Sequence, residues 1–288
     1  MRIAIIGSFD FHLECIGFLL EMYRSNIVDI YLGIETDKYN WIEYYLTLFD
    51  FNVLYDSFDK DIIDNYDKIF KISSNDDCLD DEKIISLLHL NTESHRKCKS
   101  KKFISLTPYI QDKNINYIFP IYRGLLNDNF NFKKKIGMIG HYTNDNFDDD
   151  IINFITKNSN YNFRFMIFGS SYPKLSNLKN VTLLTNLNTN DMIDFVIKSQ
   201  YILSKKKINY DRFSGQLSLA MSHEIPLIID ARTQKAYNLP GVTFYNNYSD
   251  IGNLDYVTDE QYNLLKNQIK TCKDNLIDKN KKIFQSEF

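Results

Sequence analysis

Glycine and serine residues occur in the second half of the chain where short apolar runs end or where a helical pattern begins. They occur in the segments Gly140-His141, Gly169-Ser170 and Ser214-Gly215-Gln216. Glycine allows a ligand to approach the backbone closely, and a helix that begins at such a point offers free N–H groups and a positive dipole to an anion. The pattern favours binding of a phosphate or diphosphate group. It is also typical of any tight turn from a strand into a helix.

Two basic residues near Ser214 are suited to the same chemistry. Lys205 follows the apolar run that ends at Ser204, and Arg212 precedes Ser214 by two residues. A guanidinium group matches phosphate oxygens with two parallel hydrogen bonds, whereas an ammonium group acts as a point charge. The alternative interpretation is a solvated run of charge, since two further lysines follow Lys205.

Ionisable side chains also follow the first apolar run of the chain, Arg2–Ile6, after its terminal Gly7. They are Asp10, His12 and Glu14. A carboxylate or imidazole at this point has the chemistry to deprotonate a hydroxyl group or to stabilise developing charge. We expect catalytic roles for His12 and Asp10, and interpret Glu14 as a first-turn acid that the helix dipole favours.

Parallel sheets are needed to bring these residues together. Arg2–Ile6 and Lys135–Ile139 open the two halves of the chain in the same way, as a strand that ends in glycine and is followed by a helical pattern. Short strands that alternate with helices predict doubly wound sheets, which bind ligands at the carboxyl ends of their strands. The polar segment 122–135 reads as a linker, so we expect domains at residues 1–127 and 128–257.

A long helix is predicted at the end of the chain. Thr258 to Gln261 form a capping box, and apolar residues then recur at intervals of three and four. A continuous helix would be about 40 Å long. We expect residues 258–288 to pack back toward the N-terminal domain.

The stretch Tyr210–Ile229, YDRFSGQLSLAMSHEIPLII, resembles a signature of the retaining nucleotide-sugar glycosyltransferases of the GT-B fold. Their pattern is E-x7-E followed by A-M-A-x-G-x-P-V-I. Asp211 falls on the first acid, Ala220-Met221-Ser222 on A-M-A, and Pro226-Leu227-Ile228 on P-V-I. The chain departs from the family at Leu219, in place of the acid that holds the nucleotide ribose, and at His141, in place of an arginine.

The resemblance implies an α/β fold with two Rossmann-like domains that face a cleft, an acceptor-side domain at 1–127 and a donor domain at 128–257. It implies transfer of a sugar from a nucleotide-sugar donor to a glycan or glycosylated acceptor, with no cofactor and no metal. The implied catalytic residues are His12, Asp10 and Asp211. The implied donor-binding residues are Gly140, His141, Gly169, Ser170, Lys205, Arg212, Ser214, Gly215 and Gln216.

Two other functions are open at this point. The missing ribose acid and the missing arginine favour a degenerate GT-B-like protein that binds a ligand without turnover. A sugar-nucleotide epimerase on the same fold would use Asp10 and Glu14 for acid–base chemistry.

Composition limits the partners and the compartment. The 288 residues carry a formal net charge of −3, with 44% hydrophobic residues. We therefore expect no nucleic-acid partner. No apolar stretch reaches 18 residues, so we expect no membrane span. The four cysteines are scattered and the N-terminal apolar run is short, which favours a cytoplasmic protein.

Overall fold

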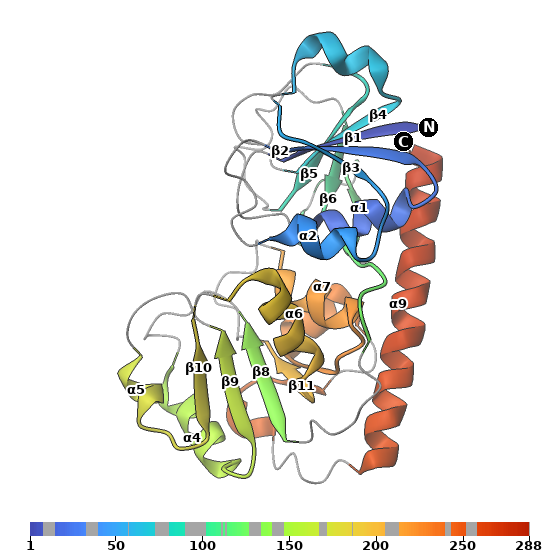
Figure 1. The fold of residues 1–288 in the computed structure, drawn as a ribbon. Helices are drawn as coiled ribbons and strands as arrows, with labels where there is room; N and C mark the ends of the chain where they lie inside the picture. Colours follow the sequence, from blue (N-terminus) through green and yellow to red (C-terminus); the bar gives the residue numbers. More distant parts are fainter. Residues whose placement is uncertain are drawn as a thin grey trace. The chain divides into compact units, whose positions relative to one another are not determined.

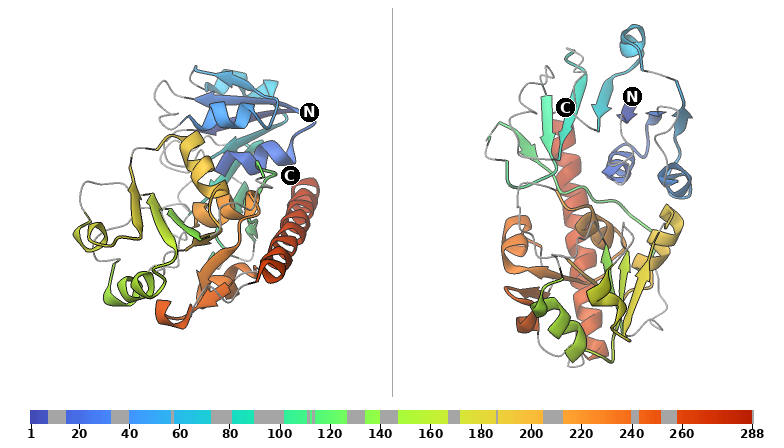
Figure 2. Two further views of the ribbon diagram at one scale, coloured as in Figure 1. Left: turned by 60° about the horizontal axis from the view of Figure 1, so that its bottom comes forward. Right: turned by 90° about the vertical axis from the view of Figure 1, so that its left-hand side faces the viewer.

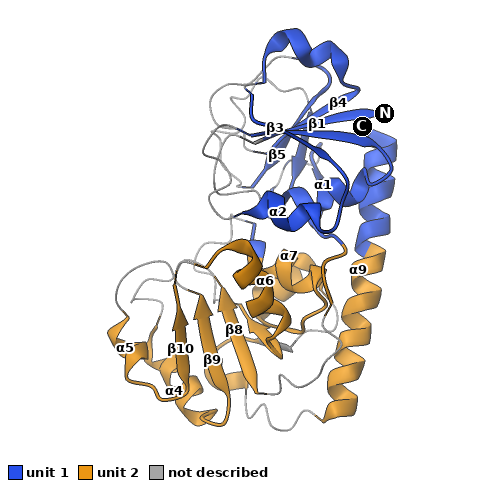
Figure 3. Cartoon of the chain, viewed as in Figure 1, with its two compact units in different colours: residues 1–122, 209–215, 276–288 blue, residues 123–208, 216–275 orange. Residues whose placement is uncertain are grey.

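The computed structural model describes most of the chain (Figure 1). The described residues are 1–7, 15–32, 40–56, 58–72, 81–89, 102–110, 112, 114–126, 134–139, 147–166, 172–185, 187–204, 213–239, 243–251 and 258–287. They form two compact units, shown in two colours in Figure 3. The first unit comprises residues 1–122, 209–215 and 276–288, and the second comprises 123–208 and 216–275.

The first unit is built on a parallel sheet in the order β3-β2-β1-β4-β5-β6-β7. Its elements are β1 (Arg2–Gly7), α1 (Ile16–Met22), β2 (Ile27–Leu32), α2 (Trp41–Leu46), β3 (Asn52–Leu54), η2 (Lys60–Asn65), β4 (Lys68–Lys71), β5 (Ile84–Leu88), β6 (Lys102–Ser105) and β7 (Asn116–Tyr117). The strands are rich in buried Ile, Leu and Phe, as parallel strands covered on both faces are.

Aromatic side chains hold the final turns of α9 (Asp259–Glu287) against this sheet. The ring of Phe284 lies 5.7 Å from that of Phe70 on β4, 6.2 Å from Phe18 and 5.9 Å from Tyr23, centroid to centroid. Figure 2 shows these last turns of α9 beside the strands of the first sheet. The predicted return of the C-terminal helix to the first domain is thus confirmed.

A buried carboxylate ties together the start of β1, β2 and β3. Asp29 is 1% exposed and accepts hydrogen bonds from Arg2, Asn52 and Tyr66 at 2.7–2.9 Å. Burial alone would raise the pKa of Asp29, but these hydrogen bonds and the charge of Arg2 lower it overall. The network fixes the amino end of the sheet, at the edge opposite the predicted site.

The second unit contains a parallel sheet in the order β10-β9-β8-β11-β12-β13. Its elements are β8 (Lys135–Ile139), α4 (Asp149–Lys157), β9 (Asn162–Met166), α5 (Pro173–Ser176), β10 (Val181–Leu184), α6 (Thr189–Ile197), β11 (Tyr201–Leu203), α7 (Gly215–Ser222), β12 (Leu227–Asp230), α8 (Ala231–Tyr237), β13 (Thr243–Tyr245) and η4 (Tyr248–Ile251), followed by the start of α9. The register pairs Ile139 with Met166, so β8 and β9 end together.

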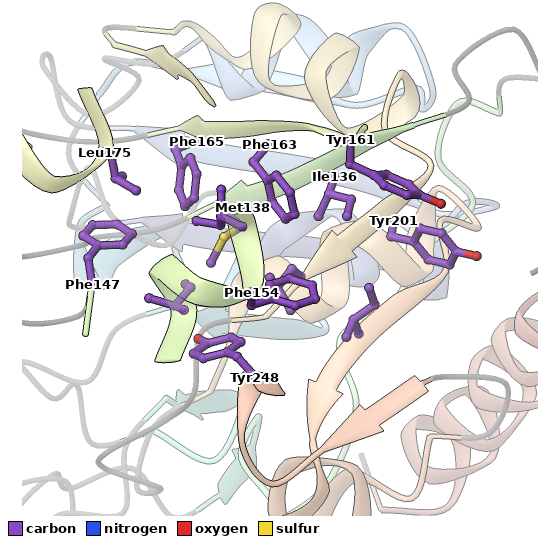
Figure 4. Close-up of a cluster of buried hydrophobic side chains, with 14 of the residues drawn as sticks. Ile136, Met138, Phe147, Phe154, Tyr161, Phe163, Phe165, Leu175, Tyr201 and Tyr248 are labelled. Carbon is purple, nitrogen blue, oxygen red and sulfur yellow. The ribbon is translucent and has the colours of Figure 1, made fainter. Parts of the chain in front are cut away.

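One face of this sheet carries the core of the second unit (Figure 4). Phe154 on α4, Phe163 on β9 and Tyr248 on η4 belong to this cluster, in which buried aromatic rings meet edge-on or stacked. The helix–strand alternation predicted from the sequence accounts for the cluster, because each helix must bury one apolar face on the sheet.

The capping box predicted for the C-terminal helix is present. The Gln261 N–H donates to Thr258 Oγ1 at 3.2 Å, and Thr258 N–H donates to Gln261 Oε1 at 2.9 Å. The helix runs for 29 residues. No helix within the described ranges is long and apolar enough to span a membrane. The predicted domain boundary after residue 127 falls in a segment, 127–133, outside the described residues, and stays a prediction.

Candidate functional site

Each sheet has a point at which the strand order reverses. In the first sheet it lies between β1 and β4, and in the second between β8 and β11. Both sheets therefore follow the doubly wound order 3-2-1-4-5-6, in which ligands bind outside the carboxyl ends of the two strands at the reversal. The register pairs Ile6 with Lys71 in one sheet and Ile202 with Gly137 in the other, so both pairs of strands run parallel toward this edge.

The predicted donor-binding residues follow the strands at this edge of the second sheet. Gly140 and His141 come after β8, Gly169 and Ser170 after β9, and Lys205 after β11. These five residues, together with Asp211 and Arg212, lie outside the described residues. The strands that lead to them are neighbours in the order β9-β8-β11. The C-terminal ends of these three strands therefore lie next to one another at the same edge of the sheet.

Helix α7 begins where the sequence predicts, with Ser214 directly before it and Gly215 and Gln216 in its first turn. These three residues are partly exposed, whereas the rest of the helix, Leu217 to Ser222, is buried. Because the remainder of α7 is buried, its first turn is the part of the helix that a ligand can contact. The N-terminus of α7 is therefore suited to an anion.

Leu219 is 5% exposed within α7. It occupies the position at which the signature of the resembled family has its second acid. A buried apolar side chain here cannot accept a hydrogen bond from a ribose hydroxyl.

The C-terminal end of α7 is fixed by the chain segment that enters the second unit. Gly124 N–H donates to Ser222 O at 3.2 Å, and His223 Nδ1–H donates to Leu125 O at 2.7 Å. A Cβ atom on Gly124 would lie 2.5 Å from His223 Cε1, so glycine is required for this packing. Glu224 next in sequence forms a buried ion pair with Lys273 of α9.

In the first unit, the predicted catalytic residues Asp10 and His12 come after β1 at the strand-order reversal. Both lie outside the described residues. The structure adds a histidine that the sequence interpretation did not select. His89 directly follows β5, is 7% exposed, and its Nε2–H donates to the carbonyl oxygen of Ile72 at 2.7 Å.

The backbone of His89 contacts the residue that precedes Ser214. The N–H of Phe213 donates to the His89 carbonyl oxygen at 3.0 Å, which places the residue before Ser214 at the carboxyl edge of the first sheet. Since a carbonyl oxygen can only accept, Nε2 of His89 carries a hydrogen. A histidine that directly follows a buried strand is the sequence signal that would have identified it.

No group of three or more His, Cys, Asp or Glu side chains that could hold a metal ion occurs in the part of the chain that the structure describes.

Comparison with solved structures shows which known proteins share this fold. AviGT4, a glycosyltransferase involved in avilamycin A biosynthesis, superposes with a TM-score of 0.56 at 8% identity, over 100% of this chain and 99% of that one. OtsA in its apo form gives a TM-score of 0.57 at 9% identity, again over 100% and 99% of the two chains. No protein-family model matches the chain, and no curated protein matches it significantly. The predicted fold class, two parallel-sheet α/β domains of the GT-B type with a returning C-terminal helix, is confirmed.

Proposed function

We propose that this chain is a glycosyltransferase that moves a sugar from a nucleotide-sugar donor to a glycan or glycosylated acceptor. The observation that carries the proposal is the strand order of the second sheet, whose reversal between β8 and β11 coincides with the predicted donor-binding segments. The partly exposed N-terminus of α7 after β11 supports it. The shared fold with AviGT4 agrees with it at the level of architecture.

On the donor side, backbone N–H groups and basic side chains offset the charge of the leaving diphosphate. A helix N-terminus supplies roughly half a positive charge, so α7 with Ser214, Gly215 and Gln216 offsets part of the charge and Lys205 and Arg212 offset more. Further contacts are proposed from Gly140, His141, Gly169 and Ser170. Chemistry of this kind rests on fixed dipoles and cations, and we propose no metal.

On the acceptor side, the proposed acid–base groups are His12 and Asp10, with Asp211 near the donor. His89 joins them, because its ring is held by Ile72 and its backbone contacts the segment before α7. An imidazole has the chemistry to take a proton from a hydroxyl group.

A second candidate function is a GT-B-like protein that binds a nucleotide without turnover. The burial of Leu219 favours it, because the ribose then lacks a charged hydrogen bond worth about 1.5–3 kcal/mol. Affinity for a nucleotide would be roughly tenfold or more below that of a site with the acid.

The two functions separate in a thermal-shift screen followed by an assay. The purified chain is heated with UDP, ADP, GDP, CDP or dTDP, since a ligand that binds the native state raises its stability. Nucleotide-sugars of the base that stabilises most are then tested for release of free nucleoside diphosphate, with water or an added glycan to accept the sugar. Binding with release supports the transferase, and binding without release supports the degenerate protein.

The variants His89→Gln and His89→Ala test the role of His89 in the same assay. Gln retains a nitrogen donor for Ile72 O but has no acid–base chemistry, so it should keep the unfolding midpoint near native and abolish most of the release. Ala should lower both. Release at the native rate by His89→Gln would remove His89 from the proposed site.

A further inference from the structure

The hydroxyl of Tyr245 holds the end of strand β11. Tyr245 closes β13, and its Oη–H donates to the carbonyl oxygen of Ser204 at 2.7 Å. Ser204 directly follows β11, and β12 lies between the two strands in the sheet. Both residues are 1% exposed. The contact is thus a buried hydrogen bond that spans a strand.

This bond acts on the residue that directly follows β11. The Ser204 N–H donates to Ile228 O at 2.8 Å, so pairing with β12 continues to Ser204. Its carbonyl oxygen accepts from the Tyr245 hydroxyl. Because a peptide unit is planar, fixing this oxygen constrains the orientation of the Ser204 carbonyl group.

The ring of Tyr245 is itself rigidly supported. It stacks on Tyr248 with centroids 4.8 Å apart and planes at 27°, and Tyr248 stacks on Phe154 of α4 at 6.2 Å and 26°. Asp150 of α4 accepts hydrogen bonds from the backbone N–H groups of Tyr248 and Ser249 at 2.7 and 3.1 Å. These contacts support the Tyr245 ring from the side of α4 and η4.

We propose that Tyr245 is a positioning residue for the diphosphate of the donor, acting through Ser204 at the end of β11. The inference rests on the proposed function, because it takes the edge between β8 and β11 as the donor site. A displacement of about 1 Å is enough to impair a site that works by fixed geometry. The hydroxyl should matter for binding more than for folding.

Tyr201 offers a matched control at the opposite end of the same strand. Its side chain is also 1% exposed, and its hydroxyl has no hydrogen-bond partner among the described residues. Tyr245→Phe and Tyr201→Phe thus each remove one buried hydroxyl from the second unit. They differ in whether that hydroxyl holds the end of β11.

The test is calorimetric titration of the native chain and both variants with UDP, ADP, GDP, CDP and dTDP, at a temperature where all three are folded. Tyr245→Phe should weaken the best-bound of these by about three- to tenfold, the value of one hydrogen bond, and Tyr201→Phe by less than about twofold. Loss of global stability alone does not change a dissociation constant measured on folded molecules. Equal binding by all three proteins, or equal weakening in both variants, would overturn the inference.

If Tyr245→Phe does not fold, ¹⁹F NMR can test the inference on a chain that keeps the Tyr245 hydroxyl. With 3-fluorotyrosine at position 245, the ¹⁹F resonance should shift on saturation with the same nucleotide, and with the label at position 201 it should not. An unshifted signal at 245 would contradict the role. If the native chain binds none of the five nucleotides, the proposed function fails and this inference fails with it.

Discussion

At the scale of single residues, His223 is an ionisable side chain that folding keeps neutral. It is 1% exposed, packs against Gly124, and donates through Nδ1 to Leu125 O. Burial lowers the pKa of His223 to about 4, with the charge of Lys273 acting in the same direction and the hydrogen bond to Leu125 against it. An unfolded histidine has a pKa near 6.5.

Stability should therefore fall as the pH is lowered from about 6.5 to 4. In this window the unfolded chain binds a proton at His223 that the folded chain does not, so acid favours unfolding by an amount on the order of 3 kcal/mol at full protonation. The measurement is the free energy of urea unfolding at pH 7, 5.5 and 4.5. Asp29, whose pKa is lowered below 3.8, loses its contribution only at more acidic pH and does not interfere.

His223→Asn is the control for this prediction, because its amide nitrogen can take the place of Nδ1 but does not titrate. Its unfolding free energy should change less between pH 6.5 and 4.5 than that of the native chain. The same slope in both proteins would show that another group causes the acid sensitivity.

At the scale of elements, the end of α7 combines an unusual backbone with a buried ion pair. The N–H of Ile225 donates to Ala220 O at 2.9 Å and that of Glu224 to Met221 O at 3.2 Å, which together form a Schellman motif. Glu224 occupies its left-handed position at φ 58°, where glycine is usual. Its carboxylate pairs with Lys273, so α7 is tied to α9 by a residue whose backbone conformation is unfavourable.

Removing one partner of this pair should cost far more than removing both. Lys273→Met leaves a buried carboxylate and should destabilise the protein by about 3–5 kcal/mol. Adding Glu224→Gly removes that charge and relieves the backbone strain, so the double variant should return to within about 1 kcal/mol of native. Urea unfolding of both single variants and the double variant measures this cycle, and additive losses would contradict it.

The ends of α7 differ in how far the sequence predicts them. Ser214 is a good N-cap residue and His223-Glu224 follows the last apolar repeat, so the bounds Gly215–Ser222 could be predicted from local chemistry alone. The left-handed Glu224 could not, because the helix-ending rule expects glycine there. The contact of Phe213 with His89 joins residues more than a hundred positions apart, and local periodicity carries no information about it.

At the scale of the whole molecule, the C-terminal helix contributes to both units. Its residues up to 275 belong to the second unit and those from 276 to the first. In the first unit, Asn280 is fully buried and its Nδ2 donates to Phe119 O at 2.8 Å, while Phe284 lies among Phe18, Tyr23 and Phe70. The repeated strand–glycine–helix opening predicted two parallel sheets, but it did not predict that segment 209–215 joins the first unit.

Truncation of Phe284 to alanine should loosen the first unit selectively. Loss of a fully packed aromatic ring costs about 3–5 kcal/mol, and that loss falls on the sheet that Phe284 covers. Hydrogen exchange should therefore accelerate in β1 and β4 and stay near native in β8 and β9. Leu264→Ala, which changes a side chain 57% exposed on the same helix, should leave both sheets near native. Uniform acceleration in both sheets would contradict this prediction.

The central claim is that a nucleoside diphosphate binds at the N-terminus of α7. Calorimetric titration of the native chain, Gly215→Val and Arg212→Ala with UDP, ADP, GDP, CDP and dTDP tests it most directly. We predict binding of at least one nucleotide by the native chain. Both variants should bind it more weakly, because valine crowds the backbone N–H groups and alanine removes a bidentate phosphate partner. Equal affinity in all three proteins would place the nucleotide elsewhere, and binding by none of them would contradict the proposed glycosyltransferase.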